Sequence, residues 1–97
     1  MAYRVLEYTL VDDYLERRGE FRSEHLGLAV AAHERGELVL AGALADPADR
    51  ALLVWNVDDD EIVKRFAESD PYVRNGLVRE WSIRPWTVVI GDGPPPA

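Results

Sequence analysis

The sequence predicts an α+β fold in which strands and helices follow the order β-α-β-β-α-β. The spacing of apolar residues switches along the chain between every second residue, as in a strand, and every third or fourth residue, as in a helix. At the points where this spacing switches, glycine, proline or acidic residues end one element or begin the next. The chain has 97 residues, which suits one domain and not two. We expect that domain over residues 1–90 and a flexible proline-rich tail over residues 91–97.

The first half of the chain predicts a strand and a long helix. Residues 3–10 are rich in aromatic and β-branched residues, which favour strands. Residues 21–35 contain good helix formers and no proline, and His25 lies on their apolar stripe. Gly36 follows as a helix stop signal.

The second half predicts a hairpin, a helix, a short helical turn and a last strand. These elements are expected over residues 38–44 and 51–57 (the hairpin strands), 58–68, 69–76 and 77–90. Residues 58–61 are acidic, which favours a capped helix start over a metal site, since the ligand spacing of a calcium loop is absent. Pro85 predicts a bulge or an edge position in the last strand.

This order is the split βαβ pattern of the ferredoxin-like fold, a four-stranded antiparallel sheet with both helices on one face. The two hairpin strands are apolar on both faces; with regular alternation, Leu38, Leu40 and Leu44 share one of them. A sheet with one solvated face would alternate apolar with polar residues. No segment remains to cover the second face, so we predict a homodimer.

Charge and composition exclude several kinds of partner. The formal net charge is −7, which repels phosphate backbones, so we expect no nucleic acid. No apolar run reaches the roughly 18 residues of a membrane span, and residues 1–4 lack a signal-peptide pattern. The expected location is the cytoplasm, without a membrane partner. Cysteine is absent, which excludes disulfides and thiolate metal sites.

Five short segments occur in a recognisable order along the chain. They are Arg22 with His25-Leu26, Gly36, Gly42-Ala43-Leu44, Ser69-Asp70-Pro71-Tyr72 and Ile83-Arg84-Pro85-Trp86. Together they resemble the YCII-related (YciI-like) family, from Tyr3 to about Val89. The resemblance implies a dimeric α+β barrel of two ferredoxin-like sheets. It also implies a His–Asp active site, and the matching residues here are His25 and Asp70.

Both members of that pair have a structural alternative. An imidazole titrates near neutral pH and suits proton transfer, which makes His25 a candidate general acid or base. A core or interface histidine bonded to a backbone carbonyl fits the same position. Asp70 could orient that imidazole, as the carboxylate of a triad does. An aspartate before Pro71 is also what a helix N-cap looks like, and both roles can coexist.

Three further residues are candidates for substrate binding. Arg22 lies one turn before His25 and could hold an anionic group, although a surface ion pair is the alternative. Ser69 is a weaker candidate and could be a cap, and Trp86 could line the mouth of a pocket.

The sequence leaves two functions open. One is a small-molecule enzyme of the lyase or isomerase type, acting on an aromatic or lactone-like metabolite by proton transfer, without metal or organic cofactor. The other is a non-catalytic dimeric domain that binds a small ligand.

Overall fold

The computed structural model describes residues 3–92 of the chain. In chain order the elements are β1 (Tyr3–Leu10), α1 (Tyr14–Arg17), the 3-10 turn η1 (Arg18–Glu20), α2 (Arg22–Glu34), β2 (Leu38–Ala43), β3 (Arg50–Trp55), α3 (Asp60–Ser69), α4 (Pro71–Arg74) and β4 (Val78–Trp86). Residues 93–97 of the predicted tail lie outside the described residues. Among the residues described, no helix combines the length and the apolarity that crossing a membrane requires.

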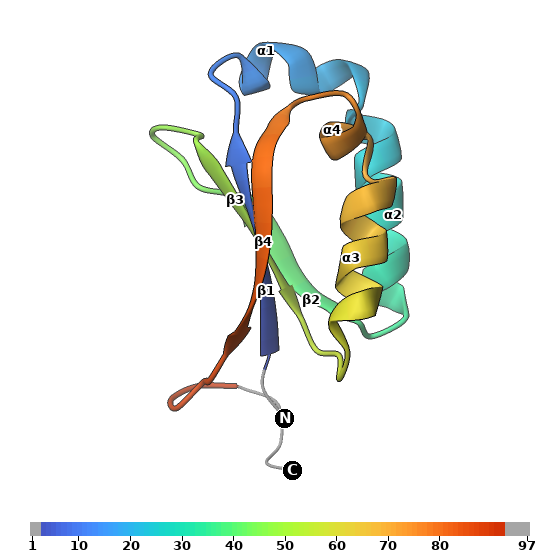
Figure 1. Cartoon of the computed structure of the whole chain (residues 1–97), viewed down its shortest axis with the longest axis vertical. Coiled ribbons are helices and arrows are strands. Elements are labelled where there is room, and N and C mark those ends of the chain that lie inside the picture. Colours follow the sequence, from blue (N-terminus) through green and yellow to red (C-terminus); the bar gives the residue numbers. More distant parts are fainter. Residues whose placement is uncertain (1–2, 93–97) are drawn as a thin grey trace.

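The four strands form one antiparallel sheet in the order β2-β3-β1-β4. The helices α2 and α3 lie together on one side of it, and α1 lies across one end (Figure 1). The predicted fold class, α+β with a four-stranded antiparallel sheet and helices on one face, is confirmed.

The core lies between the sheet and these helices. On β1 every second side chain is buried, as in a strand with one covered face, and Leu6 and Tyr8 are at most 1% exposed. Trp55 of β3 is fully buried and its ring packs against Phe66 of α3, with ring centroids 5.0 Å apart. This packing fixes α3, and with it the turn that follows, against the sheet.

A bulge in β2 changes which residues face the helices. Leu38 pairs with Trp55, but Leu40 pairs with Val54, and Ala41 pairs with Leu53. Directly opposed residues of neighbouring strands share a face, so one extra residue puts Leu38 and Ala41 on the helix side and Leu40 on the outer side. The expectation that Leu38 and Leu40 share a face is therefore wrong, because regular alternation does not continue through a bulge.

The outer face of the sheet is apolar on one half and polar on the other. Leu40 and Val54 lie side by side on β2 and β3, and Leu40 is 64% exposed. Towards β4 the outer face becomes more polar, with Glu7 beside Ser82 and Thr9 beside Glu80, although Tyr3 pairs with Trp86 at the end of the strand. The described part of the chain places no helix over this face (Figure 1). The apolar half is the surface on which the homodimer prediction now depends.

Candidate active site

Asp70 occupies the junction between α3 and α4. Its backbone is extended (φ −68°, ψ 123°), which ends α3 and lets Pro71 begin the next helix. The carboxylate atom Oδ1 accepts a hydrogen bond from the backbone N–H of Tyr72 at 3.0 Å. This is an N-cap followed by a proline whose missing N–H costs nothing in the first turn.

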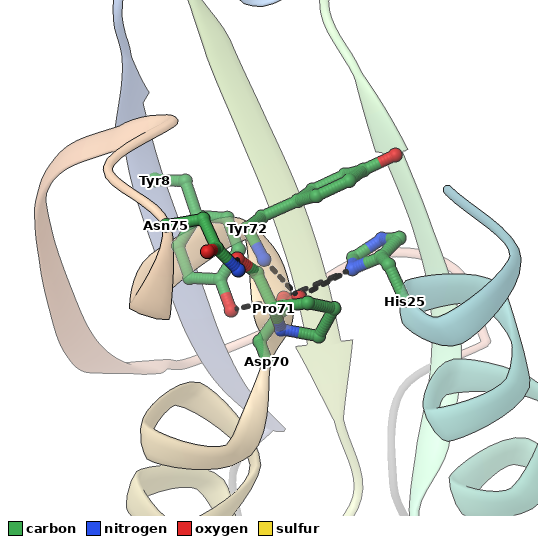
Figure 2. A network of polar contacts seen from close by, with 6 residues as sticks. All are labelled: Tyr8, His25, Asp70, Pro71, Tyr72 and Asn75. Carbon is green, nitrogen blue, oxygen red and sulfur yellow. Dashed lines mark hydrogen bonds and ion pairs between the residues drawn. The ribbon is translucent and has the colours of Figure 1, made fainter. Parts of the chain in front are cut away.

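The same carboxylate is fully buried and serves more than the cap. Its Oδ2 accepts a hydrogen bond from the hydroxyl of Tyr8 at 2.8 Å, and both oxygens lie 2.9 Å from Nδ1 of His25 (Figure 2). An ionised carboxylate is costly to bury unless donors surround it. Donors from β1, α2 and the start of α4 supply that compensation and fix the carboxylate in place.

His25 projects from α2 with its side chain 15% exposed. A carboxylate only accepts hydrogen bonds, so Nδ1 of the imidazole carries a hydrogen, and in the neutral imidazole Nε2 then has the lone pair. Within residues 3–92, Nε2 has no hydrogen-bond partner. The ring of Tyr72 stacks on the imidazole, with centroids 3.9 Å apart and planes 11° apart, and so restricts its rotation (Figure 2).

A cavity of about 230 Å³ lies beside His25, on the helix side of the sheet. Its wall combines small or apolar residues of α2, β2 and β3 with six polar or aromatic ones: Tyr8, Tyr14, Arg18, Arg22, His25 and Tyr72. The cavity therefore combines an apolar wall, two cations and the imidazole of His25, and its volume suits a small molecule.

The structure brings three of the five sequence candidates together. His25 and Arg22 line the cavity, and Asp70 lies behind His25. Ser69 lines a separate hollow between α2 and α3, and Trp86 lies at the far end of β4 on the outer face of the sheet. Neither Ser69 nor Trp86 lines this cavity, because Ser69 faces the hollow between α2 and α3 and the sheet separates Trp86 from His25.

Three tyrosines that line the cavity, Tyr8, Tyr14 and Tyr72, were not among the sequence candidates, and neither was Arg18. Burial, and then the charge and hydrogen bond of Asp70, raise the pKa of Tyr8 far above the ordinary value of 10.0. Burial first, and then neighbouring Tyr14, raise the pKa of Tyr72 to about 12. A signal for Tyr8 existed, since it shares the buried parity of Leu6 and Leu10, where a hydroxyl needs a partner.

The ferredoxin-like sheet with its helices on one face places the chain in the class of small α+β proteins of this fold. Within that class the chain belongs to the YCII-related family, since the YCII-related domain matches residues 1–87. This confirms the family expected from the short segments.

The fold also matches a solved structure. It is similar to 5-chloro-2-hydroxyhydroquinone dehydrochlorinase from Burkholderia phenoliruptrix, in complex with 2,5-dihydroxybenzoquinone, with a TM-score of 0.73 and 15% sequence identity. The match covers 88% of this chain and 93% of the dehydrochlorinase. At this identity the likeness is one of fold. No curated protein sequence matches the chain.

Proposed function

We propose that this protein is a small-molecule enzyme of the lyase or isomerase type, in which His25 transfers a proton and Asp70 orients and stabilises it. The observation that carries the proposal is the contact between Nδ1 of His25 and a fully buried carboxylate at 2.9 Å. That contact leaves the basic Nε2 at the cavity, where a substrate atom can reach it.

The chemistry begins when Nε2 takes a proton from a carbon or hydroxyl of the substrate. The negative charge of Asp70 stabilises the imidazolium that forms, as the carboxylate does in a catalytic triad. In an isomerisation, His25 returns this proton to a different substrate atom. In an elimination, the electron pair of the broken C–H bond forms a double bond, and the leaving group departs with its own pair.

The structural neighbour supports this class of reaction. That protein is a dehydrochlorinase bound to a dihydroxybenzoquinone, and dehydrochlorination removes a proton and a chloride from one molecule. We extend to this chain the reaction class and a preference for a ring of similar size. The proposal also keeps the homodimer and the cytoplasmic location expected from the sequence.

The test is the exchange of substrate protons with solvent, because this exchange reports proton transfer by His25 without requiring the complete reaction. A panel of hydroxylated quinones, quinols and unsaturated lactones is incubated in D₂O with the wild-type protein, and NMR follows the loss of substrate C–H signals. We expect exchange in at least one compound, slowed by about 100-fold or more in His25→Gln. His33→Gln is the matched control, since that histidine bonds to the carbonyl of Leu38 and lies outside the cavity.

The opposite result would be saturable binding of panel members without exchange in any of them. That outcome would replace the enzyme with the ligand-binding domain that the sequence left open.

A further inference from the structure

We propose that the cavity beside His25 binds a small planar carboxylate, whose carboxylate group is held by Arg18 and Arg22. The inference rests on the proposed function and adds the substrate class to it. Four observations on the cavity carry it.

The first observation is that the cavity concentrates uncompensated positive charge. Arg18 and Arg22 both line it, and neither forms an ion pair with any of the described residues. The chain as a whole carries 18 acidic and 11 basic residues. Two arginines that lack an ion-pair partner among the described residues, at one cavity of an acidic protein, can bind the negatively charged group of a ligand.

The second observation is that the positive charges of both arginines lie near the same side chain, Tyr72. The guanidinium of Arg18 lies over the ring of Tyr14, 5.7 Å from its centroid, and Tyr14 in turn meets the ring of Tyr72 edge-on. The charges of Arg22 and Arg18 both lower the pKa of Tyr72, against the larger effects of burial and Tyr14. Both cations are therefore near the Tyr72 phenol.

The third observation is that Tyr72 links these cations to His25. One face of its ring stacks on the imidazole, and its hydroxyl extends away from Asp70 (Figure 2). If the arginines hold the carboxylate of a ligand near the Tyr72 hydroxyl, that carboxylate is separated from His25 by about the length of the Tyr72 side-chain ring. The rest of the ligand then extends towards Nε2. A single-ring compound meets this requirement.

The fourth observation is the form of the wall. Ala41 and Ala43 face the helix side because of the bulge in β2, and with Ala29 and Ala51 they make a shallow apolar surface. At about 230 Å³ the cavity lies below the range of about 300–1,000 Å³ that is usual for drug-sized ligands. A flat body of one ring fits this space, and a larger conjugate does not.

Carboxylate is favoured over a neutral group or a phosphate by the combination of donors and wall. Two guanidinium groups offer paired N–H donors that match the two oxygens of a carboxylate. The apolar wall requires an apolar body behind that anion, which inorganic phosphate lacks.

The experiment is an NMR binding titration with benzoate, benzamide and phenyl phosphate. Benzamide keeps the size of benzoate without its charge, and phenyl phosphate keeps the ring with a different anion. We expect benzoate to bind the wild type with a millimolar dissociation constant or better, and benzamide to bind about tenfold more weakly or worse.

The variants are Arg22→Gln, Arg18→Gln with Arg22→Gln, and Arg65→Gln as the matched control. Arg65 is exposed on α3 and outside this cavity, and its replacement changes the net charge by the same single unit as Arg22→Gln does. We expect benzoate affinity to fall about tenfold in the double variant and to stay unchanged in Arg65→Gln. Arg22→Gln alone, at an exposed position without an ion pair, retains the fold and weakens benzoate binding in the same direction.

Three results would overturn the carboxylate assignment. They are equal affinity for benzoate and benzamide, unchanged benzoate affinity in the arginine variants, and tighter binding of phenyl phosphate than of benzoate by tenfold or more. None of them bears on proton exchange by His25, so the two proposals fail separately. Benzoate binding that follows the prediction, without proton exchange in any compound, would contradict the enzyme proposal and support the carboxylate site.

Discussion

Asp70 receives hydrogen bonds from three directions while its side chain is fully buried. Two of these bonds hold functional groups of the cavity, His25 through its Nδ1 and Tyr72 through its backbone. The third comes from Tyr8, whose hydroxyl donates to Oδ2. Nδ1 of His25 lies between the two carboxylate oxygens, 2.9 Å from each of them. At the scale of single residues, the position of the imidazole therefore depends on the surroundings of one carboxylate.

The change Asp70→Asn tests this dependence. An asparagine keeps a cap oxygen but loses charged hydrogen bonds to His25 and Tyr8, so the free energy of unfolding should fall by about 2 kcal/mol. The charge of Asp70 also stabilises the imidazolium that forms during proton transfer, so substrate proton exchange in D₂O should slow by about 100-fold or more in Asp70→Asn. Urea denaturation and the exchange assay measure the two effects.

Asp13→Asn is the control for Asp70→Asn, because Asp13 is exposed and makes no capping bond with its side chain. It should leave both the stability and the exchange rate unchanged. Identical exchange rates in Asp70→Asn and the wild type would reduce Asp70 to a helix cap.

Tyr8→Phe tests the donor on the other oxygen through the response to alkaline pH. The pKa of Tyr8 is raised in the folded state, so the stability that its protonated form contributes is complete below the ordinary value of 10.0. Above that pH the unfolded chain ionises first, and the free energy of unfolding falls by up to about 1.4 kcal/mol per pH unit for this group. Tyr72, with a pKa raised to about 12, adds a fall in the same direction over pH 10 to 12.

In Tyr8→Phe the decline of stability above pH 10 should therefore be shallower than in the wild type. Chemical denaturation at a series of pH values from 8 to 11 measures it. Tyr3→Phe is the control, because the Tyr3 hydroxyl donates to a backbone carbonyl at an exposed position. An equal slope in Tyr8→Phe and the wild type would show that Tyr8 does not carry this dependence.

Individual elements begin and end where local chemistry directs them. The helix α3 begins after Asp59, whose side chain accepts a hydrogen bond from the backbone N–H of Glu61 at 2.7 Å. Asp60 in the first turn also pairs with Arg4 of β1 at 2.8 Å. The acidic run at residues 58–61 thus has the capping role favoured from its position in the sequence.

The cap predicts a difference between neighbouring aspartates. Asp59→Ala should lower the free energy of unfolding by about 1 kcal/mol, because a backbone donor of α3 loses its acceptor. Asp58→Ala removes the same charge one residue earlier and should cost less than about 0.5 kcal/mol. Thermal or urea unfolding of the two variants compares them, and equal losses would assign the effect to net charge instead.

The elements were more predictable from the sequence than the site. Strand and helix spacing, with Gly36 and the Asp70-Pro71 step as boundaries, predicts the order of the main elements and the fold class. The bulge in β2 has no local signal, since residues 38–44 read as regular alternation. Its position depends on how β3 pairs with β2, which is a property of the folded sheet.

The site divides in the same way. His25 and Asp70 came from the family resemblance, and spacing alone could not bring together residues 45 positions apart. Arg18 enters the cavity only because η1 turns the chain between α1 and α2. Trp86 was expected to line the mouth of a pocket, and it lines a hollow on the outer face of the sheet, away from the cavity beside His25. A sequence pattern does not say which face of an edge strand a binding site uses.

For the molecule as a whole, the exposed apolar part of the outer face of the sheet favours a dimer. Leu40 is 64% exposed there beside Val54, and the described helices all cover other surfaces. A chain of this length gains stability by burying such a surface against a second copy. We therefore retain the homodimer as a prediction.

Light scattering at micromolar concentration should give a mass near twice 10.9 kDa. Leu40→Asp should shift the protein towards the monomer, because a buried unpaired charge is costly at an apolar interface. Leu15→Asp, at a residue 55% exposed on α1, is the control and should leave the mass unchanged. A monomeric wild type would contradict the prediction, and so would a Leu40→Asp protein that remains fully dimeric.

The double use of Asp70 has a consequence for how this protein tolerates mutation. Functional polar groups often lower stability, so that selection for stability alone can erode them. Here the carboxylate that orients His25 also begins α4, and a library selected for cellular abundance alone should retain aspartate at position 70. Position 25 should diversify more than position 70 in the same library, because the imidazole is only one of the donors to the buried carboxylate and no backbone donor depends on it. Deep sequencing before and after such a selection would show how much more strongly folding alone preserves position 70 than position 25.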